Sequence, residues 1–135
     1  MTNLDQAISQ LNNHSIVLID EKEIIVSDQK GIIPLLELIN SNKELSNFSI
    51  ADKVVGKAVA ILILKANIKN VYAKTLSVSA KNLLEKRHIN VKYSFLVDVI
   101  KNKDNTDICP MEKAIANIDD IEEGYRILKE KVHIK

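Results

Sequence analysis

Two lysines, an aspartate and a glycine stand directly before the most apolar stretch of the chain, in the order ADKVVGKA followed by VAILIL. If Asp52 caps a helix over residues 52–67, Lys53 lies in its first turn and Lys57 one turn later on the same side. The N-terminus of a helix disfavours cations and attracts anions, and Gly56 would let a bound group approach closely. The pattern therefore predicts a pocket for a phosphate or carboxylate. The same spacing would arise if both lysines only reached from a buried helix to solvent.

Thr106, Cys109 and Glu112 form a second candidate group, in the stretch TDICPME. Because proline suits a first helical turn, Pro110 predicts that Cys109 caps a helix and that Glu112 reaches back as its capping-box acid. A thiol at a helix N-terminus ionises more readily, so Cys109 is a candidate nucleophile with Glu112 or Asp52 as proton carrier. No histidine is placed by the sequence to activate this thiol, and a buried, inert cysteine explains it as well. The three side chains could instead close the ligand pocket beside Lys53.

Asp28 is a third candidate, because it stands where a predicted β-hairpin leads into the next helix. It lies in the stretch SDQKG, together with Gly31. Asp28 could line the same crevice as Lys53, or it could serve with Gly31 in an ordinary turn. Its position alone keeps it among the ligand-binding candidates.

The histidines predict no metal site, and no cofactor is expected. His14, His88 and His133 stand at the ends of predicted elements. They share no ligand spacing with one another or with Cys109.

Composition and charge indicate one globular domain over residues 1–135. The chain is 46% hydrophobic and 27% charged, which is ordinary for a domain with a buried core. A net charge of +1 gives no broad electrostatic basis for binding nucleic acid. The longest apolar run is too short to span a bilayer, and MTNLDQAISQ does not resemble a secretory signal. We therefore expect a cytoplasmic protein without a membrane partner.

Hydrophobic periodicity predicts helices that alternate with strands around these residues. An N-terminal helix within residues 1–13 precedes the hairpin, and a helical extension over 110–135 ends the chain. The predicted helices cover residues 3–12, 34–39, 52–67, 78–88, 110–117 and 120–132. The predicted strands cover residues 15–19, 23–27, 48–51, 70–76 and 90–97.

This order predicts an α/β fold with three layers, α/β/α, built on a mixed five-stranded sheet. The helix over 52–67 is apolar on nearly every side, so the sheet must cover one face. Another layer or a second subunit must cover the other face. This surplus of apolar surface predicts a homodimer.

The order hairpin, helix, strand, helix, strand, helix, strand resembles the cytidine deaminase-like fold. The stretches SDQKGIIPL, ADKVVGKAVA and TDICPME resemble a small uncharacterised prokaryotic family, a domain of unknown function, that is grouped with this superfamily. The resemblance spans residues 14–115 and is most specific over 52–60. It implies a cytidine deaminase-like topology, and it implies no particular reaction.

The sequence departs from zinc-dependent deaminases at both metal-binding positions. Those enzymes carry His-Ala-Glu or Cys-Ala-Glu after the hairpin, and Pro-Cys-x-x-Cys at a later helix. Here the first position reads GIIPLLE and the second reads ADKVVGK, so neither supplies an imidazole or a thiol. Glu37 alone cannot generate hydroxide without a metal. We predict that the protein is not a zinc-dependent deaminase and leave open whether it is an enzyme.

We predict that the protein binds a small ligand at the N-terminus of the helix starting at Asp52. The ligand would be anionic, or nucleobase-containing and nucleotide-like. Lys53 and Lys57 would neutralise its charge, and Asp52 would orient its hydrogen-bond donors. The alternatives are a metal-free enzyme with Cys109 as nucleophile, and a non-catalytic module that docks a protein partner. The docking surface would be the apolar helix over 52–67 or the C-terminal amphipathic helix over 120–132.

Overall fold

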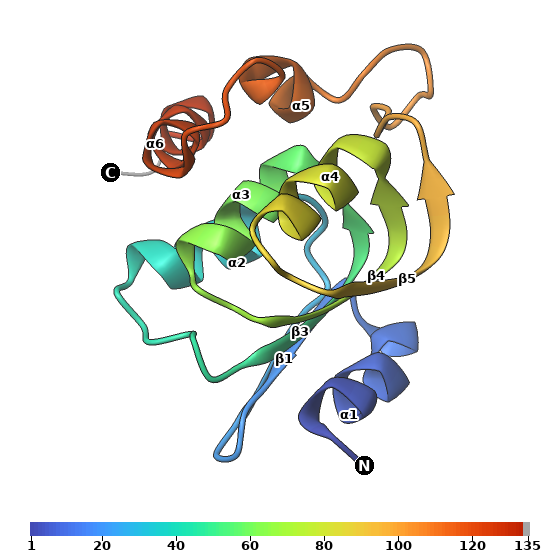
Figure 1. Ribbon diagram of the computed structural model, residues 1–135, viewed down its shortest axis with the longest axis vertical. Coiled ribbons are helices and arrows are strands. Elements are labelled where there is room, and N and C mark those ends of the chain that lie inside the picture. The colour runs from blue at the N-terminus through green and yellow to red at the C-terminus, as the bar shows by residue number, and fades with distance from the viewer. Residues whose placement is uncertain (134–135) are drawn as a thin grey trace.

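The computed structural model describes residues 1–133, and its centre is a mixed five-stranded sheet (Figure 1). The strands are β1 (Ile16–Ile19), β2 (Ile24–Ser27), β3 (Ser49–Val55), β4 (Asn70–Ser77) and β5 (Val91–Val97). Their order across the sheet is β2-β1-β3-β4-β5. Strand β1 pairs antiparallel with both β2 and β3, whereas β3, β4 and β5 run parallel. The predicted α/β fold with a mixed five-stranded sheet is confirmed.

Helices cover both faces of this sheet. They are α1 (Asn3–Gln10), the 3₁₀ turn η1 (Leu11–Asn13), α2 (Ile33–Asn40), α3 (Lys57–Lys65), α4 (Val78–Lys86), α5 (Pro110–Ile115) and α6 (Ile121–Lys131). Helix α1 packs against β1, β3 and β4 on one face, and α2, α3 and α4 lie on the other (Figure 1). Helices α5 and α6 pack on the outer side of α3, so this side of the sheet carries a further partial layer (Figure 1).

The third long helix begins five residues later than predicted, at Lys57 and not at Asp52. Strand β3 continues through Asp52 and Lys53 to Val55, and Gly56 is the N-cap of α3. β-Branched residues at the end of this segment favour an extended backbone, and the parallel strand β4 gives it a partner along its length. The prediction of a helix that starts at Asp52, with Lys53 in its first turn, is therefore wrong.

Helix α3 forms the centre of the hydrophobic core. All seven residues from Lys57 to Ile63 are buried. The sheet covers one side of the helix, while α2, α4, α5 and α6 pack around the rest of it (Figure 1). The second cover that the sequence requires is thus supplied by helices of the same chain.

The C-terminal helices follow the predicted pattern. Asp120 caps α6 by accepting a hydrogen bond from the Glu123 backbone N–H at 2.9 Å, and acidic residues occupy its first turn. The apolar side of α6 packs on the core through Ile121, Tyr125 and Leu128. Residues 134 and 135, the end of the predicted extension, lie outside the described residues. Among residues 1–133, none of the helices has the length and apolar character needed to cross a membrane.

Candidate functional site

The N-terminus of α3 holds an anion from the chain itself. The Glu112 carboxylate, which belongs to α5, accepts hydrogen bonds from the backbone N–H groups of Lys57 and Ala58, both at 2.8 Å. A Cβ atom on Gly56 would lie 2.7 Å from the Glu112 Cδ atom, so a residue with a side chain would push this carboxylate away. The attraction of this helix end for negative charge was predicted, but its backbone donors bind Glu112. Glu112 therefore does not act as the capping-box acid of α5.

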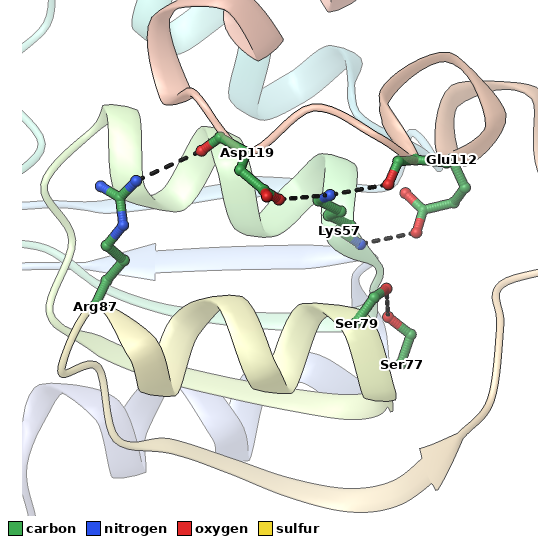
Figure 2. Close-up of polar contacts among 7 residues, drawn as sticks. Lys57, Ser77, Ser79, Arg87, Glu112 and Asp119 are labelled. Atoms are coloured by element: carbon green, nitrogen blue, oxygen red, sulfur yellow. Dashed lines mark hydrogen bonds and ion pairs between the residues drawn. The ribbon is translucent and has the colours of Figure 1, made fainter.

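The Lys57 side chain leaves α3 in another direction, toward the linker between α5 and α6 (Figure 2). Its ammonium group donates to the backbone oxygen of Ala116 and to Asp119 Oδ1, each at 3.1 Å. Only 11% of the Lys57 side chain is exposed, against 79% for Asp119. The hydrogen bond from Lys57 and its positive charge hold the pKa of Asp119 below its usual range. The nearly buried Lys57 ammonium group is therefore paired with an Asp119 carboxylate that is accessible to solvent.

A cavity of about 270 Å³ lies beside this pair, between α3, α4 and the α5–α6 linker. The residues lining it are Lys57, Ser79, Asn82, Leu83, Lys86, Arg87 and Asp119. Five of these, from Ser79 to Arg87, lie on one side of α4 and its C-cap, where residues three and four apart are neighbours. The Arg87 guanidinium lies 3.5 Å from the Asp119 backbone oxygen (Figure 2). The cavity thus gathers cations from two helices around a single carboxylate.

Asp52 lies away from this cavity lining, buried in β3 between Ile16 of β1 and Ala73 of β4. Its carboxylate accepts a hydrogen bond from the Val54 backbone N–H at 3.2 Å. Burial raises the pKa of Asp52 to about 7, although hydrogen bonds from the backbone of Val54 and Lys53 act in the opposite direction. This carboxylate is a buried strand residue and does not cap a helix.

The other predicted ligand-binding residues are dispersed. Lys53 is half-buried on β3, where its backbone N–H donates to the Ser15 oxygen at 3.1 Å. Asp28 pairs with His14 Nδ1 at 2.8 Å, and the Thr106 backbone N–H donates to Asn102 Oδ1 at 3.0 Å. Of the eight predicted ligand-binding residues, Lys57 is the one that lines the cavity. Gly56 and Glu112 lie next to each other at the N-terminus of α3, adjacent to Lys57.

Cys109 is the N-cap residue of α5, as predicted, and its thiol is half-buried. Its side chain makes no capping hydrogen bond. Of the two proposed proton carriers, Glu112 is bound to the backbone of α3, and Asp52 is buried in β3. Among residues 1–133, no three His, Cys, Asp or Glu side chains are grouped as metal ligands would be.

A second cavity, of about 390 Å³, lies between the β1–β2 hairpin and α2. Its lining is largely apolar and includes Ile16, Leu18, Ile25, Pro34 and Leu38. Glu37 is the one charged residue in that lining. This cavity offers no set of charges that would define a ligand.

The contribution of α4 to the cavity was not predicted from the sequence. Ser79, Asn82 and Lys86 are spaced as one side of a helix, which is a signal that the sequence contains. An exposed helix face gives the same pattern, and Lys86 and Arg87 also suit the negative end of the α4 dipole. The α4 residues form a candidate site, and not just a solvated helix face, because the Lys57 side chain of α3 lines the same cavity.

Comparisons with known proteins identify relatives of the chain. A family model described as TM1506: Domain of unknown function (DUF1893) matches residues 6–132. The crystal structure of a DUF1893 family protein (TM1506) from Thermotoga maritima, at 2.70 Å resolution, is similar with a TM-score of 0.87 and 28% sequence identity. That similarity covers 97% of this chain and 91% of the other. A search of curated proteins finds no match to the chain.

Proposed function

We propose, from the premise that the chain belongs to the DUF1893 family, a domain of unknown function, that this protein binds a small anionic ligand. The binding site is the cavity between α3, α4 and the α5–α6 linker. The observation that carries the proposal is the convergence of Lys57, Lys86 and Arg87 on this one cavity. The site lies beside the α3 N-terminus, where the sequence predicts an anion, but it does not use the backbone donors that Glu112 occupies.

Charge and preorganisation support binding of an anion. Lys57 is held in a nearly buried position by Ala116 and Asp119, so a ligand would meet an ammonium group whose side chain is already ordered. Lys86 and Arg87 are exposed and add positive charge on the opposite wall. Ser79 and Asn82 add neutral hydrogen-bond donors.

The size and lining of the cavity favour the anionic part of the hypothesis over the nucleobase part. Its volume, about 270 Å³, lies just below the range of about 300 to 1,000 Å³ that is usual for ligand pockets. None of the seven lining residues is aromatic, so the cavity wall offers no ring on which a base would stack. The ligand is therefore a small anion, or an anionic group whose remainder extends into solvent.

The two alternative functions have less support from the geometry. Catalysis through Cys109 would need a proton carrier, but the Glu112 carboxylate is engaged by the backbone of α3 and Asp52 is buried in β3. A partner that docks on α3 or on the apolar side of α6 would compete with the packing of these two helices on each other. Binding of an anion requires no such rearrangement.

The strand order also supports a cytidine deaminase-like topology, which we infer together with the function. In that fold a hairpin is followed by parallel strands that are connected by helices. The strand order β2-β1-β3-β4-β5, with β1 antiparallel to its neighbours, agrees with this arrangement. The inference concerns fold alone, because function belongs to a site and not to a topology.

Titration of sulfate into the protein at low ionic strength, followed by amide chemical shifts, tests the proposal. We expect saturable shifts at α4 residues and at Lys57, with weaker binding at higher salt because partly exposed charges are screened. The Lys86→Gln variant should bind several-fold more weakly, since the cavity loses a cation.

Lys81→Gln is the matched control for this titration. Lys81 lies on the same helix and pairs with Glu85 at 2.9 Å, outside the cavity lining. The control changes the net charge by the same amount but should leave sulfate binding nearly unchanged. Equal losses in the two variants would mean that sulfate responds to overall charge and not to the cavity.

A further inference from the structure

The charges around the cavity indicate which class of anion it takes. Lys57, Lys86 and Arg87 supply three positive charges and Asp119 supplies one negative charge, which leaves a net charge of +2. A ligand with two negative charges balances this lining, whereas a ligand with one does not. We propose that the cavity selects the dianionic form of a phosphomonoester group over monoanions. The inference rests on the proposed function and extends it by naming the ligand class.

Lys57 is the group that a dianion must engage, and it already has a carboxylate partner. Asp119 Oδ1 lies 3.1 Å from the Lys57 ammonium nitrogen, while 79% of the Asp119 side chain is exposed. An incoming monoanion carries the same charge as this carboxylate and gains little by replacing it. A dianion gains about twice as much from the same cations, because Coulomb energy scales with the charge of each partner. Displacing Asp119 from Lys57 is therefore a threshold that costs every anion the same, and a dianion offsets this cost more readily than a monoanion.

The neutral donors of the lining suit the tetrahedral oxygens of a phosphate group. A phosphomonoester presents three strong acceptor oxygens. Ser79 and Asn82 lie on the same side of α4 as Lys86 and can donate without changing the charge balance. The Arg87 guanidinium offers paired N–H groups, a geometry that matches phosphate.

Three probe anions separate this inference from general anion binding. Methyl phosphate is a phosphomonoester with a second pKa of about 6, so it changes from monoanion to dianion between pH 5 and pH 8. Dimethyl phosphate stays a monoanion over this range, and sulfate stays a dianion. Dissociation constants are measured for each anion on the full chain, by the chemical-shift titration described above, at pH 5 and at pH 8.

We expect methyl phosphate to bind about tenfold more tightly at pH 8 than at pH 5, relative to sulfate, because about one tenth of it is dianionic at pH 5. The ratio to sulfate cancels any titration of protein groups that changes the affinity for both anions. Dimethyl phosphate should bind more weakly than methyl phosphate at pH 8. A ratio that does not change with pH, or equal binding of the two phosphates at pH 8, would overturn the inference while leaving the proposed function intact. Failure of sulfate itself to bind would instead remove the proposed function.

Asp119→Asn provides an independent test of the threshold. The substitution removes the only negative charge in the lining and keeps the shape of the side chain. Sulfate and dimethyl phosphate should both bind several-fold more tightly to this variant, and dimethyl phosphate should become a measurable ligand. Unchanged affinities would show that the bound anion does not displace Asp119 from Lys57 and would contradict the threshold.

Discussion

Asp52 places a carboxyl group in a part of the sheet where the fold offers little to stabilise a negative charge. It is 8% exposed, and backbone N–H groups are the hydrogen-bond donors that oppose its desolvation. Its pKa rises from 3.8 to about 7 in the folded protein. An acid whose pKa is higher in the folded state favours folding at low pH, because the native protein binds the proton more tightly. Stability should therefore be lost as the pH rises from about 4 to about 7.

The Asp52→Asn variant removes this titration and should be more stable than the wild type at neutral and basic pH. From pH 5 to pH 8, its advantage in unfolding free energy should grow by about 2 to 3 kcal/mol. Urea denaturation of both proteins at the two pH values measures the difference. An advantage that stays constant with pH would show that Asp52 does not titrate with a raised pKa.

At the scale of elements, Glu112 joins the C-terminal helices to the core. The carboxylate leaves α5 and binds two backbone N–H groups at the N-terminus of α3. Lys57 makes the reciprocal contact, from α3 to Ala116 and Asp119 in the linker that follows α5. Because α5 has only six residues, it depends on such tertiary contacts for its stability.

Glu112→Gln should destabilise the protein by about 1 to 3 kcal/mol, because it weakens hydrogen bonds to a charged acceptor at a helix N-terminus. Thermal or urea unfolding measures the loss. Glu37→Gln, on the exposed surface of α2, is the matched control and should change stability by less than about 0.5 kcal/mol. Similar effects of the two substitutions would mean that the contact between α5 and α3 contributes no net stability.

At the scale of the whole molecule, the surface expected to support self-association is the edge of the sheet and not α3. The apolar surface of α3 is covered within the chain, whereas β5 is an edge strand with an unpaired side. This strand exposes Tyr93, Phe95 and Leu96, and Phe95 is 59% exposed. Edge strands with exposed apolar side chains favour pairing with another chain. The homodimer stays a prediction, with β5 as its expected interface.

Light scattering of the purified protein tests this prediction. The expected mass is twice the 15.2 kDa of one chain. Phe95→Glu places a charge on the exposed strand and should shift the mass toward that of the monomer, while Val26→Glu on the opposite edge strand β2 should not. A wild-type protein that is monomeric at high concentration would contradict the prediction.

Local pattern in the sequence determined most of the fold. The periods of apolar residues place most strands and helices close to their observed ranges, except that β3 extends to Val55 and α3 begins only at Lys57. Their order predicts the mixed sheet. An aspartate before an apolar run resembles a helix cap, so the sequence predicts a helix that begins at Asp52. Only the pairing of β3 with β1 and β4 decides that this residue is extended.

From the sequence alone, the helix dipole, Gly56 and the two lysines predict an anion at the start of the apolar helix, with lysines that only reach solvent as the alternative. Which group supplies that charge was decided by the tertiary structure, because Glu112 stands more than fifty residues away along the chain. The cavity was decided in the same way. Lys57 belongs to α3, and the other cations of the cavity belong to α4 and its C-cap. The spacing of residues in the sequence does not show that these two helices come together, because their positions are set by packing around a shared core.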